Sequence, residues 1–264
     1  MTFNGQPGTF HPQGGQAEPN QRPSASRAGG RAYPPAPDHL SPREIFPGLW
    51  YVSASHHQRP PPGLRYSRNM VVVCGADGLV LVNPVRLSSD AEAALLRHGP
   101  VRHVVRLGTY HGRDDAYYVE TFGAQFWAAP GDYRHPLPAS MRELSEHGPG
   151  PIPGARAVVF HQATLPEAVL FMPEHRLLLT CDSVQHYGRD PLLSPLARLV
   201  MLPMGFFRPC VIGPLWRKAV TPDHGSLRPD FERVLGLDFD NLISAHGTPK
   251  LGGAKAALAR QVAR

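Results

Sequence analysis

Three short polar segments of this sequence carry side chains that could do chemistry together. His111, Asp114 and Asp115 lie in the segment GTYHGRDD, Asp182 follows the run LLLTC, and His246 follows NLISA. Imidazoles and carboxylates are the groups that commonly bind divalent metals or transfer protons in enzymes. Each segment comes directly after an apolar run, and in α/β proteins the loops at strand ends commonly hold ligands. The three segments therefore predict one shared site.

Each of these residues also has a purely structural interpretation. Asp114 or Asp115 could cap a helix that follows, and Asp182 could cap a turn or accept backbone N–H groups. His246 could be a buried imidazole bonded to a carbonyl oxygen. We favour the shared site, because strand ends of one sheet system can face a common cleft and a threefold coincidence is less expected.

Continuously apolar runs predict the strands that must position these side chains. Residues 69–74 and 79–83 flank an Asp77-Gly78 turn, which is a strong hairpin signal. Further strands are predicted at 103–107, 125–129, 157–160, 168–171, 177–181 and 241–245. Because the runs are apolar at consecutive positions rather than at alternate ones, we expect a sheet that is covered on both faces.

Five segments have the pattern of helices. They are 90–98, which begins with the capping-box spacing Ser89-Asp90-Ala91-Glu92, then 116–122, the short run MRELSEH, 228–237 and 253–264. The apolar segment 190–220 is broken by five prolines. It predicts short helices that pack on the body of the domain. A membrane-touching flap is the weaker interpretation, so we do not expect membrane contact.

Composition limits the class of protein. Residues 1–42 hold 6 Gly and 8 Pro without an apolar period, which predicts a disordered tail, and 43–264 is long enough for one domain. The net charge of +6 comes from scattered arginines, so no nucleic-acid surface is expected. The three cysteines lie far apart, and no signal pattern or apolar stretch of membrane-spanning length is present. A cytoplasmic location is the default expectation.

The order of these features resembles the metallo-β-lactamase superfamily over residues 45–264. The features are an Asp-Gly hairpin, a helix, a strand with Thr109 before the polar segment, a late strand ending in Asp182, and a last strand ending in Ala245-His246-Gly247. The resemblance implies an α/β fold, a four-layer αββα sandwich in which two mixed β-sheets are flanked by helices. It also implies a metal cleft at one edge of the sheets.

The sequence departs from the family at the first metal-binding motif. In the family the segment after the threonine normally reads His-x-His-x-Asp-His. The matching positions here are Tyr110, Gly112, Asp114 and Asp115. Both histidines of the first pair are therefore absent, Asp114 is retained, and Asp115 replaces a histidine. His111 lies one position off the pattern, which makes the motif degenerate.

The resemblance divides the ligand positions between two metal ions. The positions of Tyr110 and Gly112 belong to the first ion, which we expect to be absent. The second ion takes the positions of Asp114, Asp115, Asp182 and His246. Another family histidine has its nearest counterpart in His161, although the spacing is about two residues long and Glu167 competes with it.

Two functions follow from this ligand set. Three carboxylates and one imidazole suit a single divalent ion, Mn²⁺, Fe²⁺, Mg²⁺ or Zn²⁺. The first hypothesis is therefore mononuclear hydrolysis of a small-molecule ester, amide or phosphoester. In it Asp182 is a ligand, and Asp114 or Asp115 is a ligand or base. His111 orients the substrate or shuttles protons, and Tyr110 donates to an oxyanion. The alternative is a non-catalytic binding module with a vestigial site, which the missing histidines favour.

Overall fold

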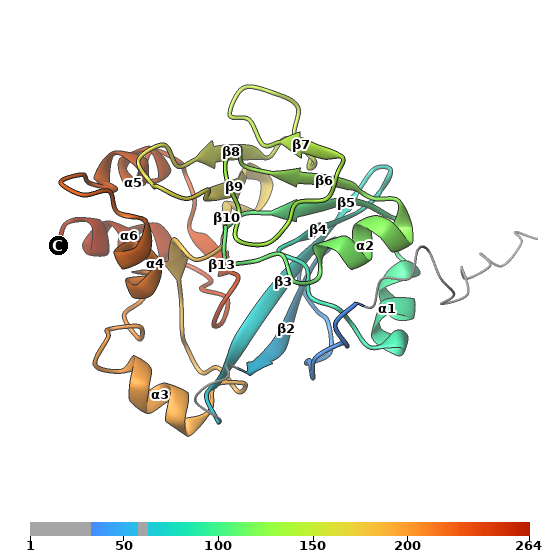
Figure 1. The fold of residues 1–264 in the computed structure, drawn as a ribbon, viewed down its shortest axis with the longest axis horizontal. Coiled ribbons are helices and arrows are strands. Elements are labelled where there is room, and N and C mark those ends of the chain that lie inside the picture. The colour runs from blue at the N-terminus through green and yellow to red at the C-terminus, as the bar shows by residue number, and fades with distance from the viewer. Residues whose placement is uncertain (1–32, 58–62) are drawn as a thin grey trace, which may run out of the picture. The chain divides into compact units, whose positions relative to one another are not determined.

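A seven-stranded sheet is the largest element of the computed structural model, which describes residues 33–57 and 63–264 (Figure 1). Its strands follow one another in sequence order. They are β1 (Arg43–Phe46), β2 (Leu49–His57), β3 (Arg65–Gly75), β4 (Gly78–Val82), β5 (Val101–Arg106), β6 (Gln125–Ala128) and β7 (Met141–Glu143). Strands β1 to β4 are antiparallel neighbours, and β4 to β7 run parallel. The sheet is therefore mixed, as predicted.

The predicted Asp-Gly hairpin joins β3 to β4. Gly75 lies opposite Gly78, and pairing continues to Val71 opposite Val82. Gly78 has φ 143°, and a Cβ there would lie 2.4 Å from the carbonyl oxygen of Pro100. Only glycine fits this close approach, which places the hairpin turn against the start of β5.

A second mixed sheet carries the later part of the chain. Its order is β13–β10–β9–β8, with β8 (Arg156–Val159), β9 (Ala168–Met172), β10 (Leu177–Thr180) and β13 (Asn241–Ser244). The short 3₁₀-helix η1 (Pro173–His175) connects β9 to β10, and those strands are antiparallel. Strands β10 and β13 are parallel, with Thr180 opposite Ser244. Residues that follow these two strands therefore leave the sheet at the same edge.

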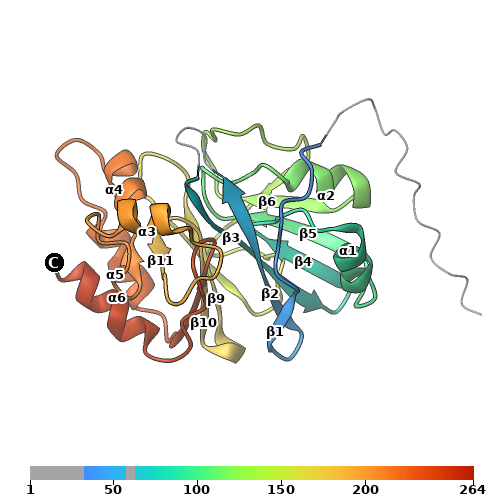
Figure 2. The ribbon, with the colours of Figure 1, turned by 90° about the horizontal axis from the view of Figure 1, so that it is seen from below.

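Helices cover the outer faces of both sheets (Figures 1 and 2). Helices α1 (Ser89–Leu96) and α2 (Asp115–Phe122) pack on the first sheet, where Leu95 and Tyr118 join its outer core. Helices α4 (Pro214–Val220), α5 (Arg228–Leu235) and α6 (Ala254–Val262) pack on the second sheet. The resulting helix–sheet–sheet–helix order confirms the predicted four-layer sandwich.

Strand β4 shows why the strand sequences are continuously apolar. Val80 and Val82 point into the core between the two sheets, whereas Leu79 and Leu81 point into the core beneath α1 and α2. Successive side chains of a strand face opposite sides, so a strand buried on both sides needs apolar residues at every position. The prediction from the apolar runs is confirmed on this physical ground.

Two expectations from the sequence differ from the structure. The run MRELSEH was expected to be helical, but Met141–Glu143 is the edge strand β7, paired in parallel with β6. Residues 1–32 of the predicted tail lie outside the described residues. Residues 38–40, at its end, are ordered along β2, because the Ser55 backbone N–H donates to the carbonyl oxygen of Asp38 and the Leu40 N–H donates to that of Ser53.

The apolar segment after position 190 forms short elements, as its prolines predict. They are α3 (Pro195–Met201), β12 (Val211–Ile212) and α4. Strand β12 pairs with β11 (Val184–Gln185), which precedes this segment, in a separate two-stranded sheet. Within residues 33–57 and 63–264, no helix combines the length and the apolar character that crossing a bilayer requires.

Candidate metal centre

The candidate site is formed by side chains that follow three strands. Asp182 and His246 each come two residues after the paired residues Thr180 and Ser244, so they leave the second sheet together. His111 comes from the loop after β5 in the first sheet. The two sheets are joined at this edge by a hydrogen bond from the Ala168 backbone N–H to the carbonyl oxygen of Leu107, 2.7 Å.

The three side chains meet at short distances. His246 Nε2 lies 3.1 Å from Asp182 Oδ1 and 3.2 Å from His111 Nε2. His111 Nε2 lies 3.8 Å from Asp182 Oδ2. All three residues are buried. The convergence that the strand ends predicted is therefore present for His111, Asp182 and His246.

Hydrogen bonding fixes the orientation of the His246 ring. Its Nδ1 lies 2.7 Å from the carbonyl oxygen of Ser67, and a carbonyl accepts but cannot donate. Nδ1 therefore carries a proton, and Nε2 is the ring nitrogen that faces Asp182 and His111. A metal-binding histidine typically has its other nitrogen bonded in this way.

The contacts at the centre require a proton or a cation. Nε2 of His246 and the Asp182 carboxylate are both acceptors once Nδ1 is committed to Ser67, yet they lie 3.1 Å apart. Either a proton on Nε2 or a cation between the groups satisfies this contact. In tetrahedral zinc sites with bonds of about 2.0–2.1 Å, ligand atoms lie about 3.3 Å apart. The observed separations of 3.1, 3.2 and 3.8 Å fit such a cation.

Burial keeps the His111 ring neutral and ready to act as a ligand. It lowers the pKa of His111 to about 3, and the charge of Asp182 offsets only part of this effect. The His111 Nδ1 atom is buried and has no hydrogen-bond partner in the described part of the chain. At Asp182 burial acts to raise the carboxyl pKa, but the hydrogen bond with His246 and the charges of His111 and His246 together leave this pKa below its ordinary value.

Cys181 extends the cluster. Ligand atoms of His111, Cys181 and Asp182 all lie within 4.8 Å of one another. This set shares two members with the trio that includes His246, and the trio has the shorter separations. Burial and the neighbouring carboxylates raise the pKa of the Cys181 thiol well above its ordinary value. Without a cation, Cys181 is therefore a neutral thiol beside the centre.

Glu167 is a buried residue that contacts the backbone next to Asp182. Its Oε1 accepts a hydrogen bond from the Ser183 backbone N–H at 2.7 Å, and its buried Oε2 has no partner among the described residues. Burial and the charge of Asp182 raise the pKa of Glu167 well above its ordinary value. A Cβ at Gly108 would lie 2.5 Å from Oε2, so glycine makes room for this carboxyl group. Glu167 thus provides an unsatisfied polar atom next to the centre.

Asp114 and Asp115 are engaged with arginines. Asp114 Oδ2 accepts from Arg68 Nη1 at 3.1 Å, and Asp115 Oδ2 accepts from Arg106 Nε at 2.6 Å. Burial raises the pKa of Asp115, and Arg106 counteracts part of that effect. Within the described residues, neither carboxylate belongs to the group whose ligand atoms lie within 4.8 Å of one another. Both carboxylates are thus paired with arginines, and in the described residues neither forms a hydrogen bond or ion pair with His111, Asp182 or His246.

Arg106 fills the space next to Gly112. A Cβ at Gly112 would lie 2.3 Å from Arg106 Cζ, and φ at this position is 126°. The buried guanidinium also donates to the carbonyl oxygens of His135 and Pro136. A side chain at position 112 therefore conflicts with both the backbone and this arginine.

The remaining predicted site residues, Tyr110 and His161, lie apart from the cluster. Tyr110 packs against the core between the second sheet and its helices, and Arg134 lies over its ring at 5.4 Å. The His161 side chain is 61% exposed, and its Nε2 lies 3.5 Å from Glu146 Oε1. The structure does not bring either side chain to His111, Asp182 and His246.

Residues outside the predicted set surround the cluster. The Tyr66 ring lies 5.5 Å from the His246 ring and 5.0 Å from the His56 ring. Burial, and then the charge of Asp182, raises the pKa of Tyr66. Burial, and then the charges of Arg68, His246 and Arg113, lowers the pKa of His56 to about 4. The His56-His57 pair gave a sequence signal, whereas Tyr66 is indistinguishable there from a strand residue.

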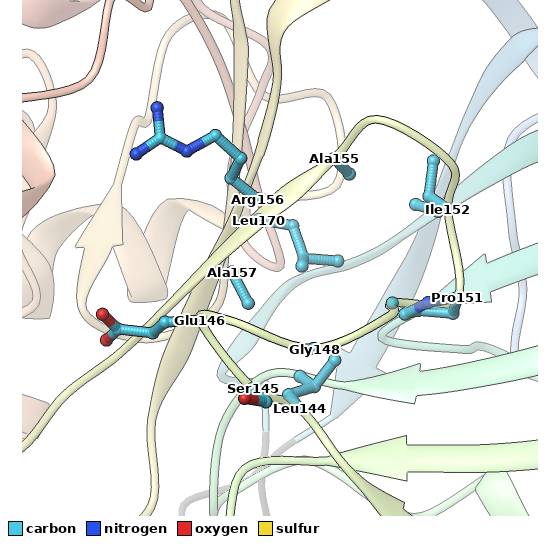
Figure 3. A pocket seen from close by; sticks show the side chains of 11 residues that line it. Leu144, Ser145, Glu146, Gly148, Pro151, Ile152, Ala155, Arg156, Ala157 and Leu170 are labelled. Carbon is cyan, nitrogen blue, oxygen red and sulfur yellow. The ribbon is translucent and has the colours of Figure 1, made fainter.

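Two cavities lie near these elements, and neither is lined by the three cluster residues. One of about 50 Å³ lies between the segment after β7 and strand β8, and in Figure 3 the charged ends of Glu146 and Arg156 point away from it. The other, of about 400 Å³, adjoins the segment after His246 and is lined by Tyr51, Thr248 and Arg189, among others. Only the second has the volume of a small-molecule site.

Comparison with known proteins identifies the fold through solved structures. No family model and no curated protein matches the sequence. Among solved structures, the mono-zinc form of the metallo-β-lactamase FIM-1 from Pseudomonas aeruginosa superposes with a TM-score of 0.52 at 13% identity. That match covers 87% of this chain and 97% of the other.

Two further solved structures give the same result. The metallo-β-lactamase from Pontibacter korlensis has a TM-score of 0.55 at 13% identity, over 85% of this chain and 99% of its own. The metallo-β-lactamase DIM-1, in a crystal exposed to ceftazidime, has a TM-score of 0.54 at 9% identity, over 87% and 99%. At these identities the likeness is one of fold, and it confirms the fold that the sequence resemblance implied.

Proposed function

We propose that this chain, which has the metallo-β-lactamase fold, is a mononuclear metal-dependent hydrolase of a small-molecule ester, amide or phosphoester. The observation that carries the proposal is the meeting of His111 Nε2, His246 Nε2 and the Asp182 carboxylate within 3.1–3.8 Å in a buried centre. Acceptor atoms gathered in this way need a cation or a proton between them.

The donor set narrows the choice of metal. The sequence suggested an oxygen-rich set with three carboxylates, but Asp114 and Asp115 are held by Arg68 and Arg106. Two imidazoles and one carboxylate remain, a set that suits Zn²⁺ or Fe²⁺ better than Mg²⁺. Cys181 is a possible additional ligand, and a thiolate would favour zinc further.

The chain supplies orientation and hydrogen bonds around the cation. A divalent ion supplies Lewis acidity to a carbonyl or phosphoryl group and lowers the pKa of a coordinated water. Ser67 holds the His246 ring with its lone pair toward the centre. Tyr66, which packs on that ring, is better placed than Tyr110 to donate a hydrogen bond to a developing oxyanion.

The alternative function is a non-catalytic binding module. The observation that favours it is the pairing of Asp114 and Asp115 with buried or nearly buried arginines. These ion pairs compensate both carboxylates without any metal. Arg106 also occupies the space where a side chain at position 112 would lie. Because the resemblance assigns position 112 to the first metal ion, this supports at most one ion.

Elemental analysis of the protein, purified without chelators or a His tag, tests the proposal. We expect about one equivalent of zinc or iron, in line with a single structural or catalytic centre. The double variant D182A/H246A should lose the metal, whereas H161A, which changes an exposed histidine outside the cluster, should keep it.

Activity assays then separate the two functions. Wild-type protein loaded with metal should hydrolyse at least one of a panel of aryl esters, amides and phosphodiesters, and D182A/H246A should not. Metal well below one equivalent, with no gain on reconstitution, overturns the hydrolase proposal and leaves the binding module.

A further inference from the structure

The outer face of α3 and the turn after it form a continuous apolar surface. Five of the eight large hydrophobic side chains that are exposed in the described residues lie here: Leu196, Leu199, Val200, Leu202 and Met204. We call these five residues the α3 surface. Leu199 is 70% exposed and Leu202 is 61% exposed. Residues 196, 199 and 200 share one helix face because they are spaced by three and four positions.

The α3 surface is presented by a firmly anchored segment. The opposite face of the helix buries Ala197 and Met201 against Leu193 and Phe206. Ser194 caps the helix through its hydroxyl, and it also contacts the start of β3. Its N–H donates to the carbonyl oxygen of Arg65 at 3.0 Å, and its hydroxyl accepts from the Arg65 N–H at 3.2 Å. The exposed leucines therefore stay in place at the periphery of the molecule, as Figure 1 shows for α3.

The charges of the chain segment that carries the α3 surface are all positive. From position 191 to position 222 the sequence contains Arg198, Arg208, Arg217 and Lys218 and not one Asp or Glu. Arg198 lies over the Phe207 ring at 5.3 Å, and the Arg208 guanidinium lies beside Gly205. In the described part of the chain neither arginine forms an ion pair. Exposed leucines are thus bordered by unpaired guanidinium groups.

The combination of exposed apolar side chains and arginines favours an anionic lipid bilayer as the partner. Leucines next to arginines, without acidic residues, match the acyl region and the phosphate groups of an anionic bilayer. A second copy of this chain is a poor match, because a twofold contact through the same surface would bring like charges together. We propose that the α3 surface docks the protein on an anionic lipid bilayer, with the five apolar side chains inserted and Arg198 and Arg208 at the phosphates.

The proposal differs from what the sequence suggested. The segment does pack on the body of the domain, as predicted, but only through its inner face. The outer face has the features of an interfacial helix, so membrane contact is now expected. The cluster beneath α3 includes Tyr187, with Tyr66 packed against it, and Tyr66 contacts His246. Docking would therefore bring the lipid surface close to the candidate metal centre, although binding does not depend on the proposed hydrolysis.

Vesicle co-sedimentation of the full chain tests the docking. Vesicles of phosphatidylcholine with about a third phosphatidylglycerol should retain the protein, and vesicles of phosphatidylcholine alone should retain at least about tenfold less. Rising salt should release it, because the arginine contribution is screened. The variant L199D/L202D should lose binding by at least about tenfold, and R198E/R208E should lose the preference for anionic vesicles.

A matched control guards against a general effect of surface charge. Leu251 is 53% exposed and lies outside the α3 surface, so L251D should bind as the wild type does. Circular dichroism should show all variants folded, because the changed side chains are exposed. Equal binding to neutral and anionic vesicles, or wild-type binding by L199D/L202D, overturns the proposal. A wild-type dimer that becomes a monomer in L199D/L202D would instead assign the surface to self-association and likewise overturn it.

Discussion

Ser67 connects the His246 segment to Asp190. Its carbonyl oxygen accepts from His246 Nδ1, and its hydroxyl accepts from the Gly247 backbone N–H at 2.7 Å while donating to Asp190 Oδ2 at 2.7 Å. The backbone contact positions the ring, and the hydroxyl contact positions the residue after it. Ser67 is therefore a positioning residue for the proposed ligand His246.

We expect the variant S67A to bind the metal up to about tenfold more weakly, because it keeps the carbonyl that orients the His246 ring but loses the hydroxyl that holds Gly247 directly after this ligand. Competition with a chromophoric chelator measures this affinity. The control is S55A, another buried serine, whose hydroxyl contacts His57 rather than the His246 segment. Equal affinities in S67A and wild type would exclude the positioning role.

The variant G112A tests the close approach of Arg106. The added Cβ would lie 2.3 Å from the guanidinium carbon at a backbone φ of 126°, so the free energy of unfolding should fall by about 3 kcal/mol. Urea unfolding measures the loss. G123A is the matched control, because Gly123 also has positive φ but nothing lies within 4 Å of its Cβ position. A loss of only about 1 kcal/mol is expected there.

Sequence reasoning found the residues whose signal is local and missed those whose partners are distant. His111, Asp182 and His246 each follow an apolar run, and that pattern was sufficient to group them. Cys181 is part of the same apolar run as Leu179, a pattern typical of a core residue, and its spacing does not distinguish it as a neighbour of the cluster. Roles for Asp114 and Asp115 remain predictions, because their arginine partners on β3 and β5 could not be inferred from spacing.

At the scale of elements, Glu146 connects three of them. Its Oε1 accepts from the Val159 backbone N–H at 3.0 Å and from Arg233 Nη1 of α5 at 2.5 Å, and His161 lies 3.5 Å away. Arg233 is also paired with Asp230. The loop after β7 is thereby attached to β8 and to the outer helix α5.

This attachment should make stability depend on pH. Burial acts to raise the pKa of Glu146, but hydrogen bonds from Arg233 and Val159, together with the charges of Arg233 and His161, lower the pKa below its ordinary value. The stabilisation by the Glu146 carboxylate is then fully present above the unfolded-state pKa of Glu146. It is lost as the pH falls through the lower folded-state pKa of the same group. We expect E146Q to melt below wild type at pH 7.

The difference between E146Q and wild type should disappear in acid, below the folded-state pKa of Glu146, where the wild-type carboxyl is protonated as well. Thermal unfolding followed at a series of pH values measures it. E174Q is the control, since Glu174 is an exposed glutamate of η1 for which no ion pair is formed in the described residues. A difference that stayed constant from neutral to acid pH would show that the Glu146 charge is not the cause.

Most elements could be predicted because their signals are strong and short in range. The continuous apolar runs of β3, β4 and β5 and the Asp-Gly turn specify a doubly covered sheet with little ambiguity. The helical pattern of MRELSEH was misleading. Met141–Glu143 is held as an edge strand by pairing with β6, a tertiary contact that overrides local preference.

At the scale of the whole described domain, the proposed metal centre links the two sheets. His111 belongs to a loop of the first sheet, and Asp182 and His246 follow strands of the second. A cation bound by all three would hold the sheets together at one edge. It would bind the folded chain only, because the ligands are far apart in sequence.

We expect removal of the metal by a chelator to lower the stability of the folded state. A cation present at about 100 times its dissociation constant contributes about 3 kcal/mol, or about 6–12 °C in the melting temperature of a domain of this size. Differential scanning calorimetry with and without chelator measures the change. D182A/H246A should not respond to the chelator, and a wild-type melting temperature that is equally unresponsive would contradict the proposed centre.

The distribution of His111, Asp182 and His246 over both sheets has a consequence for the order of events during refolding. Each sheet can assemble from its own strands, but the cluster does not exist until the sheets have docked. A cation could therefore not act as an early template, and its capture would mark the final stage of assembly. In a stopped-flow experiment, the signal of metal uptake should lag behind the burial of Trp127 in the core between the sheets.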